Sequence, residues 1–257
     1  MEININCDLG ESSKYHSTEN DPLLLNIVNS ANIACGYHAG DLMTMEKTVE
    51  ISKKNKVSIG AHPSFDDKEN FGRKRLNLSD KEITKLITNQ INILSEIAHK
   101  IGVTVTHVKP HGALNNMACE NYDLAKTISN SIIKINKDLI FLVPTGSEME
   151  KAGKKLGLRI AAEIFADRNY EDDGNLVSRS KSNAMITDPK IAEHHIIKMV
   201  KNQALNCYSG KQIPCEIDSV CVHGDGQTAV KTAKQIKEGL INSGVTLKSL
   251  DNMKKFI

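Results

Sequence analysis

The amino-acid sequence predicts an α/β fold, a (β/α) TIM-like barrel of seven strands. Short apolar runs alternate with longer segments of helical periodicity along the chain. No Gly/Ser-rich or Pro-rich linker interrupts this alternation, so residues 1–257 are expected to form a single domain. Side chains that can take part in catalysis or binding follow nearly every strand, and a closed barrel brings the ends of its strands to one face. The alternative is an open, doubly wound sheet, which would spread these side chains along one edge.

The seven predicted strands are short runs rich in β-branched and other apolar residues. They span residues 3–7, 30–34, 57–61, 103–108, 139–143, 159–163 and 219–222. Helical periodicity predicts helices over residues 44–55, 79–101, 122–136, 148–156, 189–204 and 227–243.

Residues at several helix ends support these boundaries. Ser79 and Glu82 have the spacing of a capping box, which pairs a side chain at each position with the backbone of the other. Pro189 after Asp188 suits a first helical turn, because proline is already in a helical φ. Gly244 suits a helix end, because glycine adopts the left-handed conformation readily.

Charge and composition exclude several classes of protein. The 33 Lys+Arg balance 31 Asp+Glu to a net charge of +2, and no basic run concentrates that charge, which argues against a nucleic-acid partner. The longest apolar run, residues 139–143, is far shorter than the roughly twenty residues of a membrane-spanning helix. The N-terminus lacks a signal-peptide pattern, so a cytoplasmic location is expected. The 6 cysteines contain no C-x-x-C pair and are expected to be free thiols.

Two carboxylates follow the first predicted strand. Asp8 and Glu11 flank Gly10, which permits a tight turn. Such a pair can divide acid and base catalysis, or hold a cation, if their pKa values differ. The alternative is that both are solvated turn residues.

The second and third strands also lead into polar residues. Asn32, His38 and Asp41 lie among small residues that let a ligand approach the backbone, although Asp41 equally suits a helix N-cap. His62 follows the third strand. Arg73, on a loop with a neighbouring glycine, could clamp a carboxylate or phosphate, or simply be solvated.

The fourth strand carries a denser cluster. Strand alternation places His107 and Lys109 on one face, directed into the barrel mouth, with His111 and Asn116 just beyond. A lysine in that position is costly without an anion, so Lys109 is expected to pair with a carboxylate or with substrate.

The last predicted strands add two further sets. Asp167 and Arg168 follow the sixth strand, and His223 and Asp225 follow the seventh. The sequence contains no H-E-x-x-H, G-x-S-x-G, G-x-G-x-x-G after the first strand, or G-x-x-x-x-G-K-[ST] pattern. The histidine and aspartate spacings permit a divalent metal without implying one.

Taken together, these motifs resemble the LamB/YcsF family, and the resemblance covers almost the entire chain. The matching segments are NCDLGE (6–11), NIACGYHAGD (32–41), GAHPSF (60–65), FGR (71–73), VKPHGALNN (108–116), EIFADRNY (163–170) and CVHGD (221–225). The chain departs from the family pattern at Asn115, where members usually have tyrosine.

The resemblance implies a barrel of the glycoside hydrolase/deacetylase type and an activity as the A subunit of 5-oxoprolinase. With subunits B and C, such a protein would open 5-oxo-L-proline (pyroglutamate) to L-glutamate while ATP, bound with Mg²⁺, is hydrolysed to ADP and phosphate. Residue type and position at the strand ends give Asp8, Glu11, His38, His62, Lys109 and His111 as the expected catalytic residues. On the same grounds the expected substrate-binding residues are Asn32, Asp41, Arg73, Asn116, Asp167, Arg168, His223 and Asp225.

Individual roles follow from residue type. Asp8 or Glu11 would act as general base, Lys109 and Arg73 would hold carboxylate or phosphoryl oxygens, and the histidines would relay protons or stabilise an oxyanion. Two other functions remain open at this stage. One is a stand-alone metal-dependent amide or ester hydrolase or deacetylase, and the other is a non-catalytic ligand-binding subunit.

Overall fold

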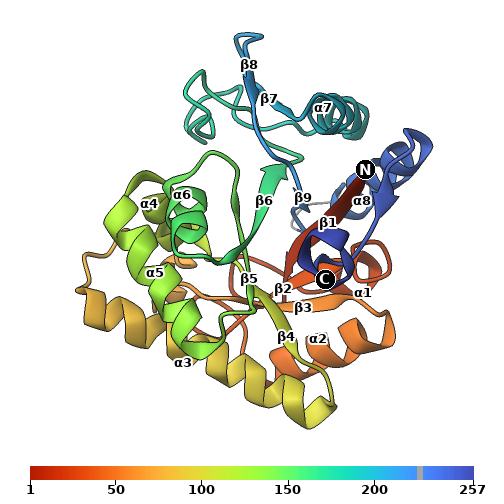
Figure 1. Ribbon diagram of the computed structural model, residues 1–257. Coiled ribbons are helices and arrows are strands. Elements are labelled where there is room, and N and C mark those ends of the chain that lie inside the picture. The colour runs from red at the N-terminus through yellow and green to blue at the C-terminus, as the bar shows by residue number, and fades with distance from the viewer. Residues whose placement is uncertain (225–227) are drawn as a thin grey trace.

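Seven parallel strands close into a barrel in the computed structural model, which describes residues 1–224 and 228–257 (Figure 1). The order around the barrel is β1-β2-β3-β4-β5-β6-β9, and β9 pairs with β1 to close it. The strands are β1 (Glu2–Leu9), β2 (Ser30–Ala34), β3 (Ser58–His62), β4 (Val105–Val108), β5 (Ile140–Pro144), β6 (Arg159–Phe165) and β9 (Ser219–Val222). The predicted seven-stranded barrel is confirmed, with every strand end within two residues of its expected position.

Helices surround the barrel and connect its strands (Figure 1). They are α1 (Asp21–Leu24), α2 (Leu42–Lys54), α3 (Asp80–Ile101), α4 (Gly112–Glu120), α5 (Tyr122–Ile135), α6 (Glu148–Lys155), α7 (Pro189–Asn202) and α8 (Ala229–Asn242). The capping box of Ser79 and Glu82 is present, and the Asp188 carboxylate accepts hydrogen bonds at the start of α7. Gly244 has the expected positive φ of 86° after α8.

Several elements were not predicted, and most of them are short. These are α1, α4, three 3₁₀ helices at Lys68–Asn70, Leu250–Asn252 and Lys254–Phe256, and three strands, β7 (Ala204–Asn206), β8 (Gln212–Pro214) and β10 (Thr246–Leu247). Strand β10 extends the sheet beside β1, whereas β7 and β8 form a separate antiparallel hairpin. That hairpin and the segment after β6 are joined by a bridge from Tyr170 to Cys207.

The outer face of the barrel is apolar, and buried polar side chains lie inside it. Helix α3 packs one side against the barrel through Ile83, Ile87, Ile91, Leu94 and Ala98, which recur at helical spacing. Inside the barrel, Asn4 Nδ2 donates to Ser30 Oγ at 2.8 Å, and Ser219 Oγ donates to Asn4 Oδ1 at 2.8 Å. Buried polar groups satisfied in this way form a rigid base on which the strand-end side chains rest.

No helix within residues 1–224 and 228–257 is long and apolar enough to span a membrane. The expectation of free thiols is confirmed, because all 6 cysteines are unpaired.

Candidate active site

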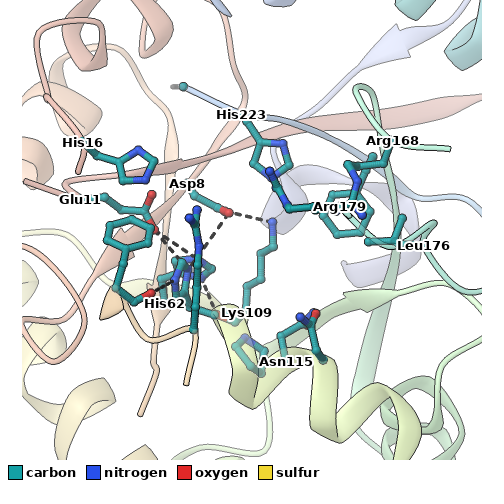
Figure 2. Close-up of a pocket in the computed structure, with 18 of the residues that line it drawn as sticks. Asp8, Glu11, His16, His62, Lys109, Asn115, Arg168, Leu176, Arg179 and His223 are labelled. Carbon is teal, nitrogen blue, oxygen red and sulfur yellow. Dashed lines mark hydrogen bonds and ion pairs between the residues drawn. The ribbon is translucent and has the colours of Figure 1, made fainter. Parts of the chain in front are cut away.

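A pocket opens where the carboxyl ends of the barrel strands converge (Figure 2). Its volume is about 260 Å³, which is small for a ligand site. Strand β1 contributes Asp8, β3 contributes His62, β6 contributes Phe165, and Lys109 and His223 follow β4 and β9. The convergence expected for a barrel therefore brings residues from distant parts of the chain to one cavity.

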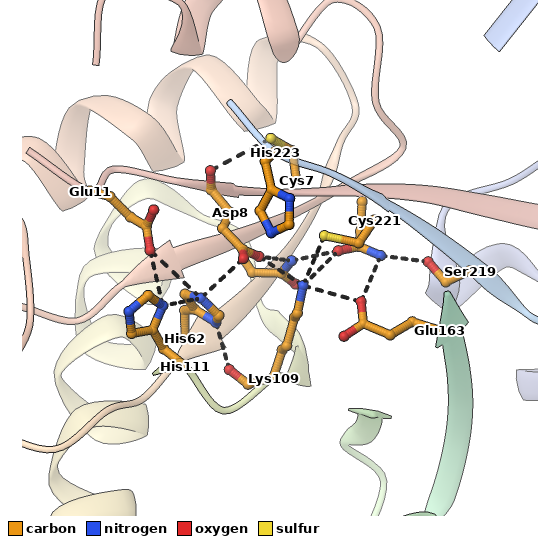
Figure 3. Close-up of polar contacts among 12 residues, drawn as sticks. Cys7, Asp8, Glu11, His62, Lys109, His111, Glu163, Ser219, Cys221 and His223 are labelled. Atoms are coloured by element: carbon orange, nitrogen blue, oxygen red, sulfur yellow. Dashed lines mark hydrogen bonds and ion pairs between the residues drawn. The ribbon is translucent and has the colours of Figure 1, made fainter. Parts of the chain in front are cut away.

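Lys109 is at the centre of a buried network beneath the pocket (Figure 3). Its Nζ lies 2.9 Å from Asp8 Oδ1 and 3.1 Å from Glu163 Oε2. It also donates to Asn6 Oδ1 and Cys221 Sγ, each at 3.2 Å. The prediction that Lys109 pairs with a carboxylate is confirmed, and two carboxylates share it.

The two carboxylates beside Lys109 differ in their readiness to ionise. Burial alone would raise the pKa of Asp8, but the charges of His62 and Lys109 outweigh it and hold that pKa well below its usual value. Burial raises the pKa of Glu163, and the neighbouring Asp8 charge adds to this increase despite Lys109. Burial opposes the charge of Lys109, yet Asp8, first among its neighbours, holds the pKa of Lys109 well above normal. Of the two carboxylates, Asp8 is therefore the one that ionises more readily.

Asn32 does not line the pocket but lies beneath it and supports Asp8, so its expected substrate-binding role stays a prediction. It is fully buried, and its Nδ2 donates to Asp8 Oδ1 and Asn6 Oδ1, each at 2.8 Å. His107 Nε2 donates to Asn32 Oδ1 at 3.0 Å, and burial lowers the pKa of His107 to about 3, which keeps it neutral. Gly60 makes room for this imidazole, because a Cβ there would lie 2.2 Å from the ring.

A second cluster joins Glu11 to three histidines. Glu11 Oε1 lies 3.2 Å from His38 Nε2, 3.2 Å from His111 Nδ1 and 3.7 Å from His62 Nε2. The rings of His38 and His111 stack with centroids 3.9 Å apart. Three predicted catalytic histidines and one predicted carboxylate are thus brought together, with His38 fully buried behind the ring of His111.

The hydrogen bonds of this cluster leave two histidine nitrogens without hydrogens, and their lone pairs face each other. His62 Nδ1 lies 2.7 Å from the Lys109 carbonyl, and His111 Nε2 lies 3.0 Å from the Phe71 carbonyl. Carbonyl oxygens only accept, so both of these nitrogens carry the ring hydrogens. The opposing nitrogens, His62 Nε2 and His111 Nδ1, are 3.0 Å apart and both face the Glu11 carboxylate. A cation, either a proton or a metal ion, is needed between them.

A proton and a metal ion are both compatible with these residues. Burial opposes protonation of His62, but Asp8 and Glu11 raise its pKa above the usual value. Burial and His111 lower the pKa of His38 to about 3, so that ring is neutral. One ligand atom from each of the four cluster residues lies within 4.8 Å of the others, and nitrogen and carboxylate donors suit zinc or a related ion. The carbonyls that hold His62 and His111 would orient such ligands.

His223 and Asp167 form an ion pair at another side of the pocket. His223 Nδ1 lies 2.8 Å from both Asp167 oxygens, and its ring stacks on Phe165. Burial would lower the pKa of His223, but the Asp167 charge outweighs this and raises it to about 9. His223 lines the pocket, whereas Asp167 does not and contacts it through His223. The expected substrate-binding role of Asp167 stays a prediction.

This ion pair predicts a pH-dependent contribution to stability. The pKa of His223 is about 9 when folded and near 6.5 when unfolded, so its contribution is complete below pH 6.5 and disappears as pH rises through 9. His223→Gln should lower the free energy of unfolding by about 3 kcal/mol at pH 6 and by little at pH 10. Urea unfolding of both proteins across this range measures the difference, and a difference independent of pH would contradict the ion pair.

Arginines and polar residues complete the pocket wall. Arg168 is buried, its Nη2 donates to the Val177 carbonyl at 2.6 Å, and Arg179 lies beside it in the wall. Burial, followed by the charge of Arg179, lowers the pKa of Arg168. Arg73 is exposed at the rim with its guanidinium 5.0 Å from the Phe71 ring centroid, and Asn116 also lines the cavity.

The remaining two predicted substrate-binding residues are Asp41 and Asp225. Asp41 is exposed at the start of α2, where its carboxylate accepts from Thr44 N at 2.8 Å, so it is a helix cap and not a wall residue. Asp225 lies outside the described residues.

Sequence reasoning missed several residues of the site. Glu163 is the one that could have been predicted most easily. It is the single acidic residue in strand β6, and a buried Lys109 requires an acidic partner. Asp21 lines the pocket, accepts from Gly10 N at 2.8 Å, and has a pKa raised by burial to about 6. Arg179 lies in an irregular loop that carries no periodic signal.

Known proteins resemble this chain along nearly its whole length. The model of the LamB/YcsF family matches residues 3–255. A Clostridium beijerinckii protein named as the A subunit of 5-oxoprolinase is 44% identical over 245 residues, covering 95% of this chain and 96% of that protein. The crystal structure of Lactam Utilization Protein from Thermus thermophilus superposes with a TM-score of 0.91 at 32% identity, covering 97% of this chain and 100% of that one. A T48 deacetylase structure, with a TM-score of 0.51 at 12% identity and coverage of 99% and 90%, shares the fold alone.

Proposed function

Because this chain belongs to the LamB/YcsF family, we propose that it is the A subunit of an ATP-dependent 5-oxoprolinase. In this proposal it acts with subunits B and C to open 5-oxo-L-proline to L-glutamate while ATP is hydrolysed to ADP and phosphate. The observation that carries the proposal is the 44% identity, over 95% of the chain, to a relative that bears this name. The pocket supports it, because its small volume and the charged residues in its wall suit a compact, charged substrate.

The chemistry explains why ATP would be required. An unstrained five-membered lactam is a poor electrophile, and phosphorylation of its amide oxygen would make the ring carbon open to attack by water. A cavity of about 260 Å³ suits the lactam better than a nucleoside triphosphate. This favours an ATP and Mg²⁺ site on a partner subunit, with the lactam in the barrel.

Two residues at the pocket floor have charges suited to the attack of water. Asp8 is ionised at neutral pH and would accept the proton of the attacking water. Lys109 is a buried cation held 2.9 Å from Asp8, and its charge would stabilise negative charge developing on oxygen. Glu11 and the three histidines would then carry the proton onward through their hydrogen-bonded cluster.

Glutamate release tests the proposed function. The chain alone, subunits B and C together, and all three subunits are each incubated with 5-oxo-L-proline, ATP and Mg²⁺. We expect glutamate and ADP in equal amounts from the complete mixture only. Absence of glutamate from the complete mixture, with all three subunits shown to be folded, would refute the assignment.

The cluster of Glu11 and three histidines favours a second candidate, metal-dependent amide or ester hydrolysis by the chain alone. The four side chains could hold a divalent ion, which would supply a Lewis acid for such a reaction. Elemental analysis of the purified chain, repeated on His62→Ala, tests this candidate. One equivalent of zinc or manganese that is lost in the variant, together with ester hydrolysis in the absence of ATP and partners, would support it.

A further inference from the structure

Two arginines on the same loop face the pocket together. Arg168 follows the end of β6, and Arg179 lies further along the same connection to α7. Pairing of Tyr170 with Leu176 and with Cys207 holds this connection against the β7–β8 hairpin. Figure 2 shows Arg168, Arg179 and Leu176 on one side of the pocket, with Glu11 and His16 on the other.

Within the described part of the chain, neither arginine has a carboxylate as an ion-pair partner. Arg168 is only 8% exposed, and its buried Nε has no hydrogen-bond partner among these residues. The nearest carboxylate in sequence, Asp167, is engaged through both oxygens by His223. Among residues 1–224 and 228–257, neither Arg168 nor Arg179 forms an ion pair within 4 Å. A buried guanidinium beside a second cation is costly, and an anion in the pocket would remove that cost.

We propose that Arg168 and Arg179 form the subsite that binds the carboxylate of the lactam substrate, an inference that rests on the proposed function. A guanidinium presents a planar set of donors that matches a carboxylate, and the side chains of both arginines line the pocket. The carboxylate of 5-oxo-L-proline is attached to the ring, so anchoring it here turns the rest of the ring toward Lys109 and Asp8 on the pocket floor. The pair thereby selects lactams that carry a carboxylate.

A phosphoryl group would offer similar oxygens, so the test must separate the two anions. The experiment uses the complete three-subunit enzyme with Arg179→Met, because Arg179 is exposed and its replacement leaves no described carboxylate without an ion-pair partner. Activity is measured with 5-oxo-L-proline and with 2-pyrrolidinone, the same ring without the carboxylate. Binding of both compounds to the assembled complex is measured by calorimetry as an independent readout.

We expect Arg179→Met to raise KM for 5-oxo-L-proline about 10- to 100-fold, as for loss of a charged hydrogen bond, with a smaller change in kcat. Arg179→Lys should recover part of the loss. The reaction with 2-pyrrolidinone should not change. Arg75→Met is the matched control, because exposed Arg75 pairs with Glu120 away from the pocket, and it should leave both substrates unaffected.

Three results would overturn this assignment or separate it from the proposed function. An unchanged KM and affinity for 5-oxo-L-proline would refute the carboxylate subsite. A fall in kcat of equal size for both substrates would assign the pair to a phosphoryl group instead. If the wild-type complex releases no glutamate, the proposed function fails, and the calorimetric comparison of the two compounds still decides whether Arg179 binds a carboxylate.

Discussion

Replacing Lys109 with methionine is expected to lower the free energy of unfolding by about 3–5 kcal/mol and to abolish glutamate formation. Methionine fills most of the same volume but leaves Asp8 and Glu163 buried without their shared cation. The cost is that of uncompensated buried charge, since both carboxylates are inside the barrel mouth. Urea unfolding measures the first effect, and the reconstituted assay measures the second.

A second substitution separates the loss of stability from the loss of activity. Glu163→Gln in the Lys109→Met background removes one of the two stranded carboxylates and should recover part of the lost stability. It should recover no activity, because the cation at the pocket floor is still missing. An active and stable Lys109→Met enzyme would contradict both the ion-pair network and the proposed role of Lys109.

Asp8→Asn is expected to reduce kcat about 10²- to 10⁴-fold while changing stability much less than Lys109→Met. The amide has the shape of the carboxylate and can still bond to its neighbours, and Glu163 remains to compensate Lys109. It cannot accept a proton from water, so the effect should be on kcat rather than on KM. Steady-state kinetics of the three-subunit enzyme measure both constants.

Asp41→Asn is the matched control for this substitution. Asp41 is an exposed cap of α2 and does not line the pocket, and asparagine caps a helix as well as aspartate does. The control should retain wild-type kcat and KM. If Asp8→Asn and Asp41→Asn behave alike, Asp8 is not the proton acceptor.

Much of the barrel could be predicted from local patterns. Strand β1 alternates Asn4, Asn6 and Asp8 with apolar residues, and this alternation persists in the structure as a polar interior and an apolar exterior. The start of α3 could also be predicted, because the bonds of the capping box join Ser79 to a residue only three positions away. The short strands β7, β8 and β10 were missed, since two or three residues carry too little periodicity to detect.

The partners of the site residues could not be predicted in this way. Residue type identified Lys109 as a buried cation, but its bonds to Asp8 and Glu163 span 101 and 54 positions of chain. Asn32 and Asp41 lie in one motif, yet one is fully buried beneath Asp8 and the other caps a helix in solvent. Spacing along the chain does not distinguish these two environments.

The amino-acid order alone predicted the seven strands and the strand ends that carry the chemistry, and it favoured a closed barrel over an open sheet. The strands could be predicted because periodicity is a local property of the chain. The tertiary structure alone decided which carboxylate ionises beside Lys109, which histidine nitrogens face Glu11, and that Arg168 and Arg179 share one wall. Those properties arise from burial and from distances across the closed barrel, and closure brings together groups that no local pattern connects.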